Sequence, residues 1–202
     1  MIQKTKLIIP FYTQERWQNW IVKVKEVGFK TDDTDDQENV VFVEMEDDVV
    51  LACLKIIAKF EKKLISKDDA LKFLSEIKEI VLRQIEPINE DIDIMLESIQ
   101  VSLIGVFASC ECYINGDFAK TRSLSKLLKA ALKAEKDKNM GVALDTVAKI
   151  GANILSGAKL KDNDFENIPE GIVAEWIDGV DCISAAMVGE TSYKNDEPFN
   201  DD

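Results

Sequence analysis

Apolar residues recur every three or four positions along most of this 202-residue chain. Because an α-helix completes a turn in about 3.6 residues, this spacing places them on one face of each helix. The first such segment covers residues 13–27 and carries Trp17 and Trp20 on its apolar face. Further helices are expected over residues 49–64, 66–86, 89–114 and 141–155, in a basic segment that ends near residue 138, and from residue 169 to about 187. Asp47 and Asp48 are expected to cap the helix over residues 49–64. The pattern predicts a mainly α protein, a compact bundle of six or seven helices.

One segment departs from the helical spacing. A polar, acidic stretch leads into Val40–Met45, a run that is rich in β-branched side chains. Such a run is typical of a strand. We therefore expect a minor β-hairpin near residues 29–45, in which this strand pairs with residues 29–31 or with residues 6–9.

The domain organisation follows from length and composition. Hydrophobic residues make up 46% of the chain, which is enough to bury a substantial core. Residues 190–202 lack helical spacing and are acidic and polar, which is the composition of a disordered segment. We predict a single helical domain over residues 1–189, followed by an acidic disordered tail over residues 190–202.

The chain is strongly acidic, with 38 Asp and Glu residues against 25 Lys and Arg residues and a formal net charge of -13. Such a charge repels phosphate backbones and anionic membrane surfaces. The longest uncharged stretch, residues 98–110, has 13 residues, whereas a membrane-spanning helix needs about 20. We expect a cytoplasmic protein that binds neither nucleic acid nor a membrane.

The chain lacks the residues that several common kinds of catalytic and binding site require. The chain has no histidine, and its nine glycines form no phosphate-binding loop. Histidine-activated nucleophiles and imidazole metal sites are therefore excluded. Cys110 and Cys112 would point about 200° apart on a helix and could not hold one metal ion. We expect no cofactor beyond a weak attraction of Mg²⁺ to the acidic segments.

A basic stripe stands out against this acidic background. Its members follow one another at steps of three and four residues, so that on a helix they fall within roughly an 80° arc. They are Arg122, Lys126, Lys129, Lys133 and Lys136. The stripe predicts a contact with a protein, which could be a partner, a second copy or an acidic segment of the same chain. The alternative is the solvated side of an amphipathic helix.

Three carboxylates lie within apolar helical sequence and are candidates for a special role. They are Glu111, Glu175 and Asp178. A buried carboxylate needs a partner or retains its proton. The alternative is a structural bond to a lysine, a tryptophan or the backbone.

Paired carboxylates could also support metal-dependent hydrolysis. Glu76 and Glu79, followed by Glu90 and Asp93, have the i, i+3 spacing with which two helices can hold Mg²⁺. However, Glu76 and Glu79 lie opposite the apolar face of their helix. A second candidate, a calcium loop starting at Asp33, lacks the glycine that its turn requires.

Four strings together resemble an archaeal family of unknown function, found mainly in methanogens and their relatives. The first string holds Phe11-Tyr12, Glu15-Arg16-Trp17 and Asn19-Trp20, and the others run over Asp47–Lys55, Glu97–Leu103 and Ala174–Gly179. The resemblance spans almost the full length of the chain. It implies an archaeal cytoplasmic protein with one full-length domain, and it transfers no activity and no residue role.

These observations leave three hypotheses open. The first is a non-enzymatic interaction or regulatory module. The second is a carboxylate-based, divalent-metal-dependent hydrolase of nucleotides or other phosphate esters. The third is a scaffold that associates with itself.

Overall fold

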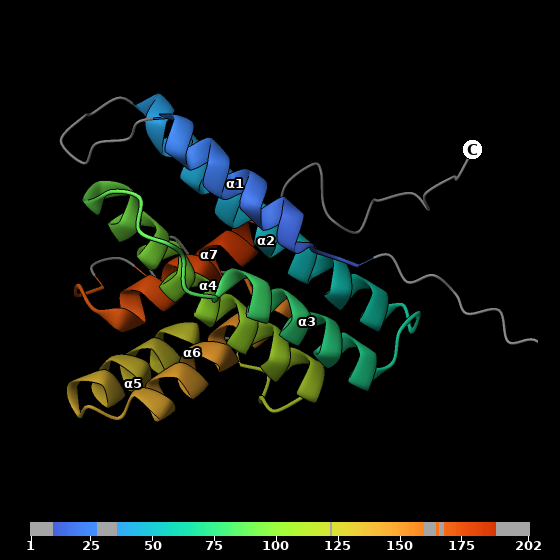
Figure 1. Ribbon diagram of the computed structural model, residues 1–202. Helices are drawn as coiled ribbons and strands as arrows, with labels where there is room; N and C mark the ends of the chain where they lie inside the picture. Colours follow the sequence, from blue (N-terminus) through green and yellow to red (C-terminus); the bar gives the residue numbers. More distant parts are fainter. Residues whose placement is uncertain (1–9, 28–35, 122, 160–164, 166–167, 189–202) are drawn as a thin grey trace, which may run out of the picture.

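The computed structural model describes residues 10–27, 36–121, 123–159, 165 and 168–188. Within these residues the chain forms seven helices and no strand (Figure 1). They are α1 (Gln14–Val27), α2 (Asp36–Glu61), α3 (Lys67–Val81), α4 (Glu90–Asn115), α5 (Leu124–Lys136), α6 (Met140–Leu155) and α7 (Ile172–Val188). The prediction of a mainly α bundle is confirmed. The expected tail lies outside the described residues.

The prediction of a β-hairpin near residues 29–45 is wrong where the structure describes it. Val40–Met45 belong to α2, which begins at Asp36. The buried residues Val41, Phe42 and Met45 continue the helical spacing, whereas Val40 is exposed. The cost of β-branched residues in a helix is small, about 0.7 kcal/mol or less per residue, so burial of one helical face overrides it.

The same correction applies to the expected helix caps Asp47 and Asp48. Both residues lie in the middle of α2, well after its first turn. Two other polar residues do cap helices, as their sequence context suggests. The Ser66 Oγ accepts a hydrogen bond from the Asp69 backbone N–H at 3.0 Å, and the Asn89 Oδ1 accepts one from the Ile92 N–H at 2.9 Å.

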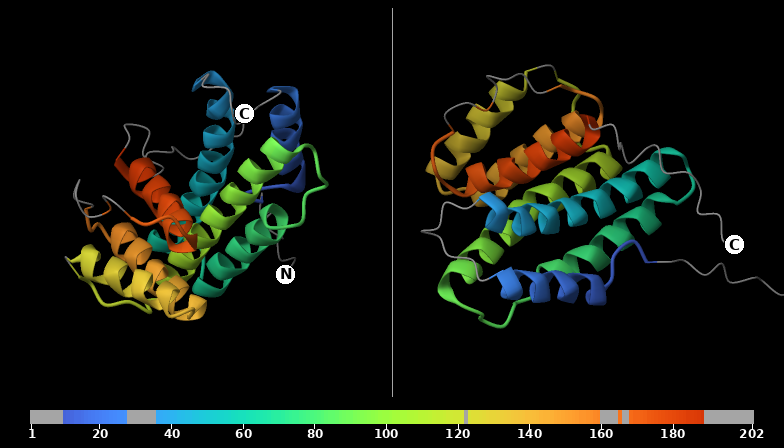
Figure 2. Two further views of the ribbon diagram at one scale, coloured as in Figure 1. Left: turned by 90° about the vertical axis from the view of Figure 1, so that its left-hand side faces the viewer. Right: turned by 90° about the horizontal axis from the view of Figure 1, so that it is seen from above.

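Helix α4 lies at the centre of the bundle. It packs against α2, α3, α6 and α7, and the right-hand view of Figure 2 shows it between the α5–α7 group and the α1–α3 group. Among the described residues α4 is also the one helix that is long and apolar enough to cross a membrane. That is weak evidence for a membrane span, because the core helix of a helical bundle passes the same test. One hydrophobic core joins all seven helices.

Small residues allow α7 to approach α4 closely. A Cβ atom added to Gly105 would lie 2.5 Å from the backbone oxygen of Trp176, and one added to Gly179 would collide with the backbone oxygen of Ser102. Because backbone atoms cannot yield as a flexible side chain can, larger residues at either glycine would push the helices apart. These contacts fix α7 on α4, and α5 is held in turn through α6 and α7.

Candidate functional site

The basic stripe lies on the outer face of α5. Leu124, Leu128 and Ala131 are buried on the inner face. The exposed lysines of the opposite face are Lys126, Lys129, Lys133 and Lys136. None of these four forms an ion pair with a described residue. Arg122, the fifth member of the predicted stripe, lies outside the described residues. We call these four lysines the α5 basic face.

A carboxylate ties the C-terminal end of α5 to the start of α7. The Glu135 Oε1 accepts a hydrogen bond from the backbone N–H of Val173 at 3.0 Å. A carboxylate at this place satisfies a free N–H and complements the positive end of the helix dipole. Gly171 leaves room for it, because an added Cβ atom would lie 2.7 Å from Glu135 Oε1. Glu135, the one acidic residue of α5, therefore has a structural role, and the exposed charges of this helix are those of its lysines.

A buried amide positions the loop that leads into α5. The side chain of Asn153 on α6 is 1% exposed. Its Oδ1 accepts a hydrogen bond from the Thr121 N–H at 2.8 Å. Its Nδ2 donates to the backbone oxygens of Lys149 at 2.8 Å and Ala119 at 3.3 Å. The loop before α5 is thus anchored on α6 by one side chain.

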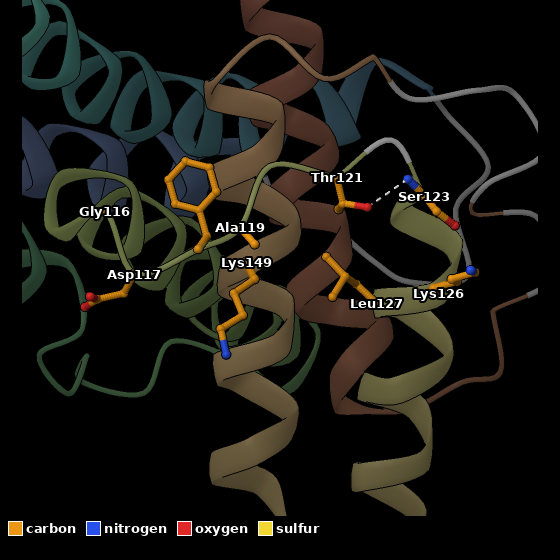
Figure 3. A pocket seen from close by; sticks show the side chains of 9 residues that line it. Gly116, Asp117, Ala119, Thr121, Ser123, Lys126, Leu127 and Lys149 are labelled. Atoms are coloured by element: carbon orange, nitrogen blue, oxygen red, sulfur yellow. Dashed lines mark hydrogen bonds between the residues drawn. The ribbon is translucent and has the colours of Figure 1, made fainter.

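A hollow of about 580 Å³ lies between this loop, α5 and α6, and we call it the α5-side hollow. Its lining is mainly apolar, with Phe118, Ala119 and Leu127 among the residues, and Lys126 and Lys149 stand at its edge (Figure 3). In Figure 3 the two lysine side chains extend in different directions. Lys149 also pairs with Asp145 at 2.5 Å. The hollow therefore suits a ligand whose apolar group contacts the lining and whose carboxylates lie beside the lysines better than it suits a single phosphate ion.

A second hollow of about 660 Å³ adjoins the first and shares Phe118 with it. We call it the α7-side hollow, because Met187 of the last turn of α7 contributes to its lining. The Tyr113 hydroxyl in its lining donates a hydrogen bond to Glu61 Oε1 at 2.7 Å. Lys63 and Lys120 also line it. Both hollows therefore combine apolar lining with lysines.

The embedded carboxylates do not come together in one site. Glu111 on α4 is half-buried and pairs with Lys78 of α3 at 3.2 Å, which is the structural bond that the sequence offered as an alternative. Glu175 is half-buried in the first turn of α7. Asp178 lies at the surface, but neighbouring protein atoms shield its carboxyl from part of the solvent, and this shielding, followed by the charge of Asp181, raises the pKa of the carboxyl. Their functional roles stay predictions.

Carboxyl groups of α2 and α7 lie near enough to Cys182 for their charges to act on its thiol. Burial, followed by the negative charges of these groups, raises the pKa of the Cys182 thiol to about 12. The group consists of Glu46, Asp47, Asp178 and Asp181. Burial raises the pKa of Glu46 and Asp47 as well. The sequence pattern missed this acidic surface, because its members come from two helices that are far apart in the chain.

The described residues contain no group of three or more His, Cys, Asp or Glu side chains that could hold a metal ion. Glu76 and Glu79 are exposed on α3, as their position opposite its apolar face predicts. Asp33, where the calcium-loop candidate that lacks its glycine would start, lies outside the described residues. Cys110 contacts Cys53 in the core, whereas Cys112 packs against α6, so the two cysteines do diverge.

Comparison with known proteins gives one match. The model of a family described as uncharacterised proteins conserved in archaea, DUF2150, matches residues 10–196. The chain belongs to this family. No curated protein and no solved structure matches the chain. The expected membership in an archaeal family of unknown function is therefore confirmed, and it assigns no activity to any residue described above.

The strings that carry the family resemblance meet in the structure. Asp48 of α2 accepts hydrogen bonds from Arg16 Nε and Trp20 Nε1 of α1, both at 2.7 Å. Arg16 also lies over the ring of buried Tyr12, 5.1 Å from its centroid. Burial, followed by the charge of Asp48, raises the pKa of the Tyr12 hydroxyl. We call these four residues the α1–α2 polar cluster.

The remaining two strings meet between α4 and α7, beside Glu46 of α2. Ser102 of α4 donates a short hydrogen bond to the Glu46 carboxylate of α2. On its other side Ser102 lies against Gly179 of α7. Trp17, which the sequence places on the apolar face of the first helix, is 2% exposed in the core. The strings that carry the resemblance thus include residues whose contacts hold the helices together, whereas the α5 basic face lies outside all four.

Proposed function

We propose that this protein is a non-enzymatic interaction module whose α5 basic face binds an acidic segment of a partner protein. The observation that carries the proposal is the set of four exposed lysines that make no ion pair with a described residue. They stand on an outer helix of a chain with a net charge of -13. A local positive surface on an acidic protein directs acidic partners to one place and repels other encounters.

The chemistry of the surface favours a protein over other anions. The net charge of the chain opposes long phosphate backbones and anionic membranes, which extend well beyond one helix face. An acidic protein segment can match a face that α5, with its 13 residues, extends over about 20 Å. Action in the cytoplasm, without a cofactor, is part of the same proposal.

The test compares two variants with equal charge change. The α5 variant combines three substitutions, Lys126→Glu, Lys129→Glu and Lys133→Glu. The matched control combines three substitutions of lysines that are exposed on α1 and α3, Lys25→Glu, Lys67→Glu and Lys72→Glu. Each purified full chain is immobilised and exposed to native cell extract at low and at high salt. Circular dichroism checks that both variants are folded.

We expect one stoichiometric protein, retained at low salt by the wild type and by the control but not by the α5 variant. Binding of that purified protein should then weaken as salt rises, because salt screens exposed charges. Retention by the α5 variant, or no stoichiometric partner at either salt concentration, would contradict the proposal. Light scattering of the pure chain at several concentrations detects the remaining alternative, binding to the acidic α2–α7 surface of a second copy.

The hydrolase hypothesis receives no support from a specific observation in the described residues. Its two best carboxylates, Glu76 and Glu79, stand exposed on α3. A panel of nucleotides with Mg²⁺ or Mn²⁺ tests it directly. Hydrolysis that is lost in a Glu79→Gln variant would revive it and would contradict a purely non-enzymatic role.

A further inference from the structure

The two hollows form one continuous surface at the end of the bundle where four helices finish. The α7-side hollow is lined by Phe60, Tyr113, Leu155 and Met187, which lie near the C-terminal ends of α2, α4, α6 and α7. The α5-side hollow continues from Phe118 to the first turn of α5. A chain segment that crosses both hollows would therefore run from the end of α7 to the start of α5.

This surface is locally positive. Lys63, Lys120, Lys126 and Lys149 line the two hollows, against the acids Glu61 and Asp117. Lys149 already pairs with Asp145, but the other three lysines make no ion pair with a described residue. An occupant that matches this surface needs apolar or aromatic groups for the lining and carboxylates for the edge.

The chain itself supplies a segment of that composition at that place. Helix α7 ends at Val188, one residue after Met187, which lines the hollow. The following residues, 189–202, lie outside the described part, and their sequence contains five acids, one lysine and two aromatic residues. These are Glu190, Asp196, Glu197, Asp201 and Asp202, then Lys194, and Tyr193 and Phe199. The family match also continues past α7 to residue 196.

Length permits the contact. An extended chain covers about 3.3–3.6 Å per residue, so that 14 residues reach roughly 46–50 Å. Helix α5 has 13 residues and is about 20 Å long. Fully extended, residues 189–202 therefore reach more than twice the length of α5 from the end of α7, where Met187 lines the α7-side hollow.

We propose that residues 189–202 bind across the two hollows of their own chain. Their aromatic side chains lie against the apolar lining around Phe118, and their carboxylates lie beside Lys120 and Lys126. This binding does not rest on the proposed function. Where both hold, the tail and an acidic partner share Lys126, so the tail competes with the partner.

The test places a nitroxide spin label on the tail of the full chain through Asn200→Cys. Cys53, Cys110 and Cys112 are buried, and Cys182, partly exposed, has a pKa of about 12, so its reactive thiolate is scarce at neutral pH. The label therefore attaches at residue 200. The measurement is the broadening of backbone amide signals in ¹⁵N-labelled protein.

We expect strong broadening of the signals of residues 116–126 at low salt and its loss at high salt. Neutralising the tail with Asp196→Asn, Glu197→Gln, Asp201→Asn and Asp202→Asn should abolish it. The matched control neutralises four exposed acids of α1, α3 and α4 through Glu26→Gln, Glu76→Gln, Glu79→Gln and Glu97→Gln, and should retain it. Unchanged signals elsewhere show that each variant is folded.

Three results would overturn the proposal. The first is the absence of broadening at residues 116–126, and the second is equal broadening in the tail variant. The third comes from a mixture of two samples: chains that carry the spin label but no ¹⁵N, and ¹⁵N chains that carry no spin label. Broadening in this mixture would show that the tail binds a second copy. None of these measurements requires a partner protein, so a failure here leaves the test of the proposed function unaffected.

Discussion

The α1–α2 polar cluster and the α5 basic face both carry charged side chains, but they use them in opposite ways. In the cluster, Asp48 accepts hydrogen bonds from Arg16 and Trp20, and its side chain is only 15% exposed. On α5 the four lysines extend into solvent without a described ion-pair partner. The cluster therefore joins two helices, whereas the α5 face leaves its charge available for something outside the bundle.

The difference follows from the cost of removing charge from water. A partly buried carboxylate must regain its lost hydration through hydrogen bonds, so that removing its partners is costly. An exposed lysine keeps its hydration and contributes little to folding. Substitutions in the two regions should consequently separate stability from binding.

Breaking the cluster should have the largest effect. We expect Asp48→Ala to lower the free energy of unfolding by about 2–4 kcal/mol, because the guanidinium of Arg16 and the indole N–H of Trp20 both lose their acceptor. Asp48→Asn keeps an acceptor for Trp20 and should lie between the alanine variant and the wild type. Urea unfolding measures both, and a wild-type midpoint for Asp48→Ala would show that the cluster does not stabilise the fold.

Removing the anchor of the loop before α5 should have the next largest effect. Asn153→Ala leaves three backbone partners without this side chain, and we expect a loss of about 1–3 kcal/mol. Amide signals of residues 117–123 should shift, whereas Lys129→Ala on the neighbouring surface should leave them in place. If the loop signals do not move in Asn153→Ala, the hollow beside α5 does not depend on this amide.

The pH dependence of stability should reveal the raised pKa of the half-buried Glu46 carboxyl. Its pKa is raised in the folded state, mainly by burial and also by the nearby Asp47 and Asp178, while Ser102 acts in the opposite direction. The folded state therefore binds the proton more tightly than the unfolded chain. The protein gains stability from this group as the pH falls through the raised pKa, down to the unfolded value of about 4.3.

Replacing this carboxyl should remove that gain. Glu46→Gln keeps an acceptor for the Ser102 hydroxyl, so we expect stability at pH 7 to be equal or higher, by about 1 kcal/mol or less. Thermal unfolding between pH 4.5 and pH 8 should show a flatter profile than that of the wild type. A profile that matches the wild type would assign its pH dependence to the other carboxyls.

The smallest effect is expected on the α5 basic face. A triple variant should change the free energy of unfolding by no more than about 0.5 kcal/mol, because exposed lysines contribute little to folding. It combines Lys126→Gln, Lys129→Gln and Lys133→Gln. The readout is the urea midpoint of the triple variant beside that of Asp48→Ala. A triple variant that unfolds would make the stripe structural and would remove the contrast between the two regions.

Sequence patterns predicted most of the helices but misassigned the first half of α2. Over six residues, Val40–Met45 has the composition of a strand. Over the 26 residues of α2, its buried positions continue the helical spacing. The shorter window could not include the burial that decides the assignment, and the error carried over to Asp47 and Asp48 as expected caps.

For the candidate sites, too, sequence patterns predicted what lies within one helix and missed what several helices form together. The arc of the α5 lysines was predictable, because it depends on positions within one helix. The Lys78–Glu111 pair was foreseen only as one of several possible structural bonds, since its partners are 33 residues apart. The hollows were not predictable, because their lining comes from the ends of several helices.

The sequence by itself determined the helical class, the buried face of most helices apart from the first half of α2, and the stripe of lysines. These features depend on local spacing and the 3.6-residue turn. Only the tertiary structure decided which charges are used for folding. Arg16 and Asp48 are 32 residues apart, and Ser102 and Glu46 are 56 apart. Their pairing depends on how the helices cross, and no local pattern encodes that geometry, so charged side chains could serve folding in α1–α2 and remain exposed on α5.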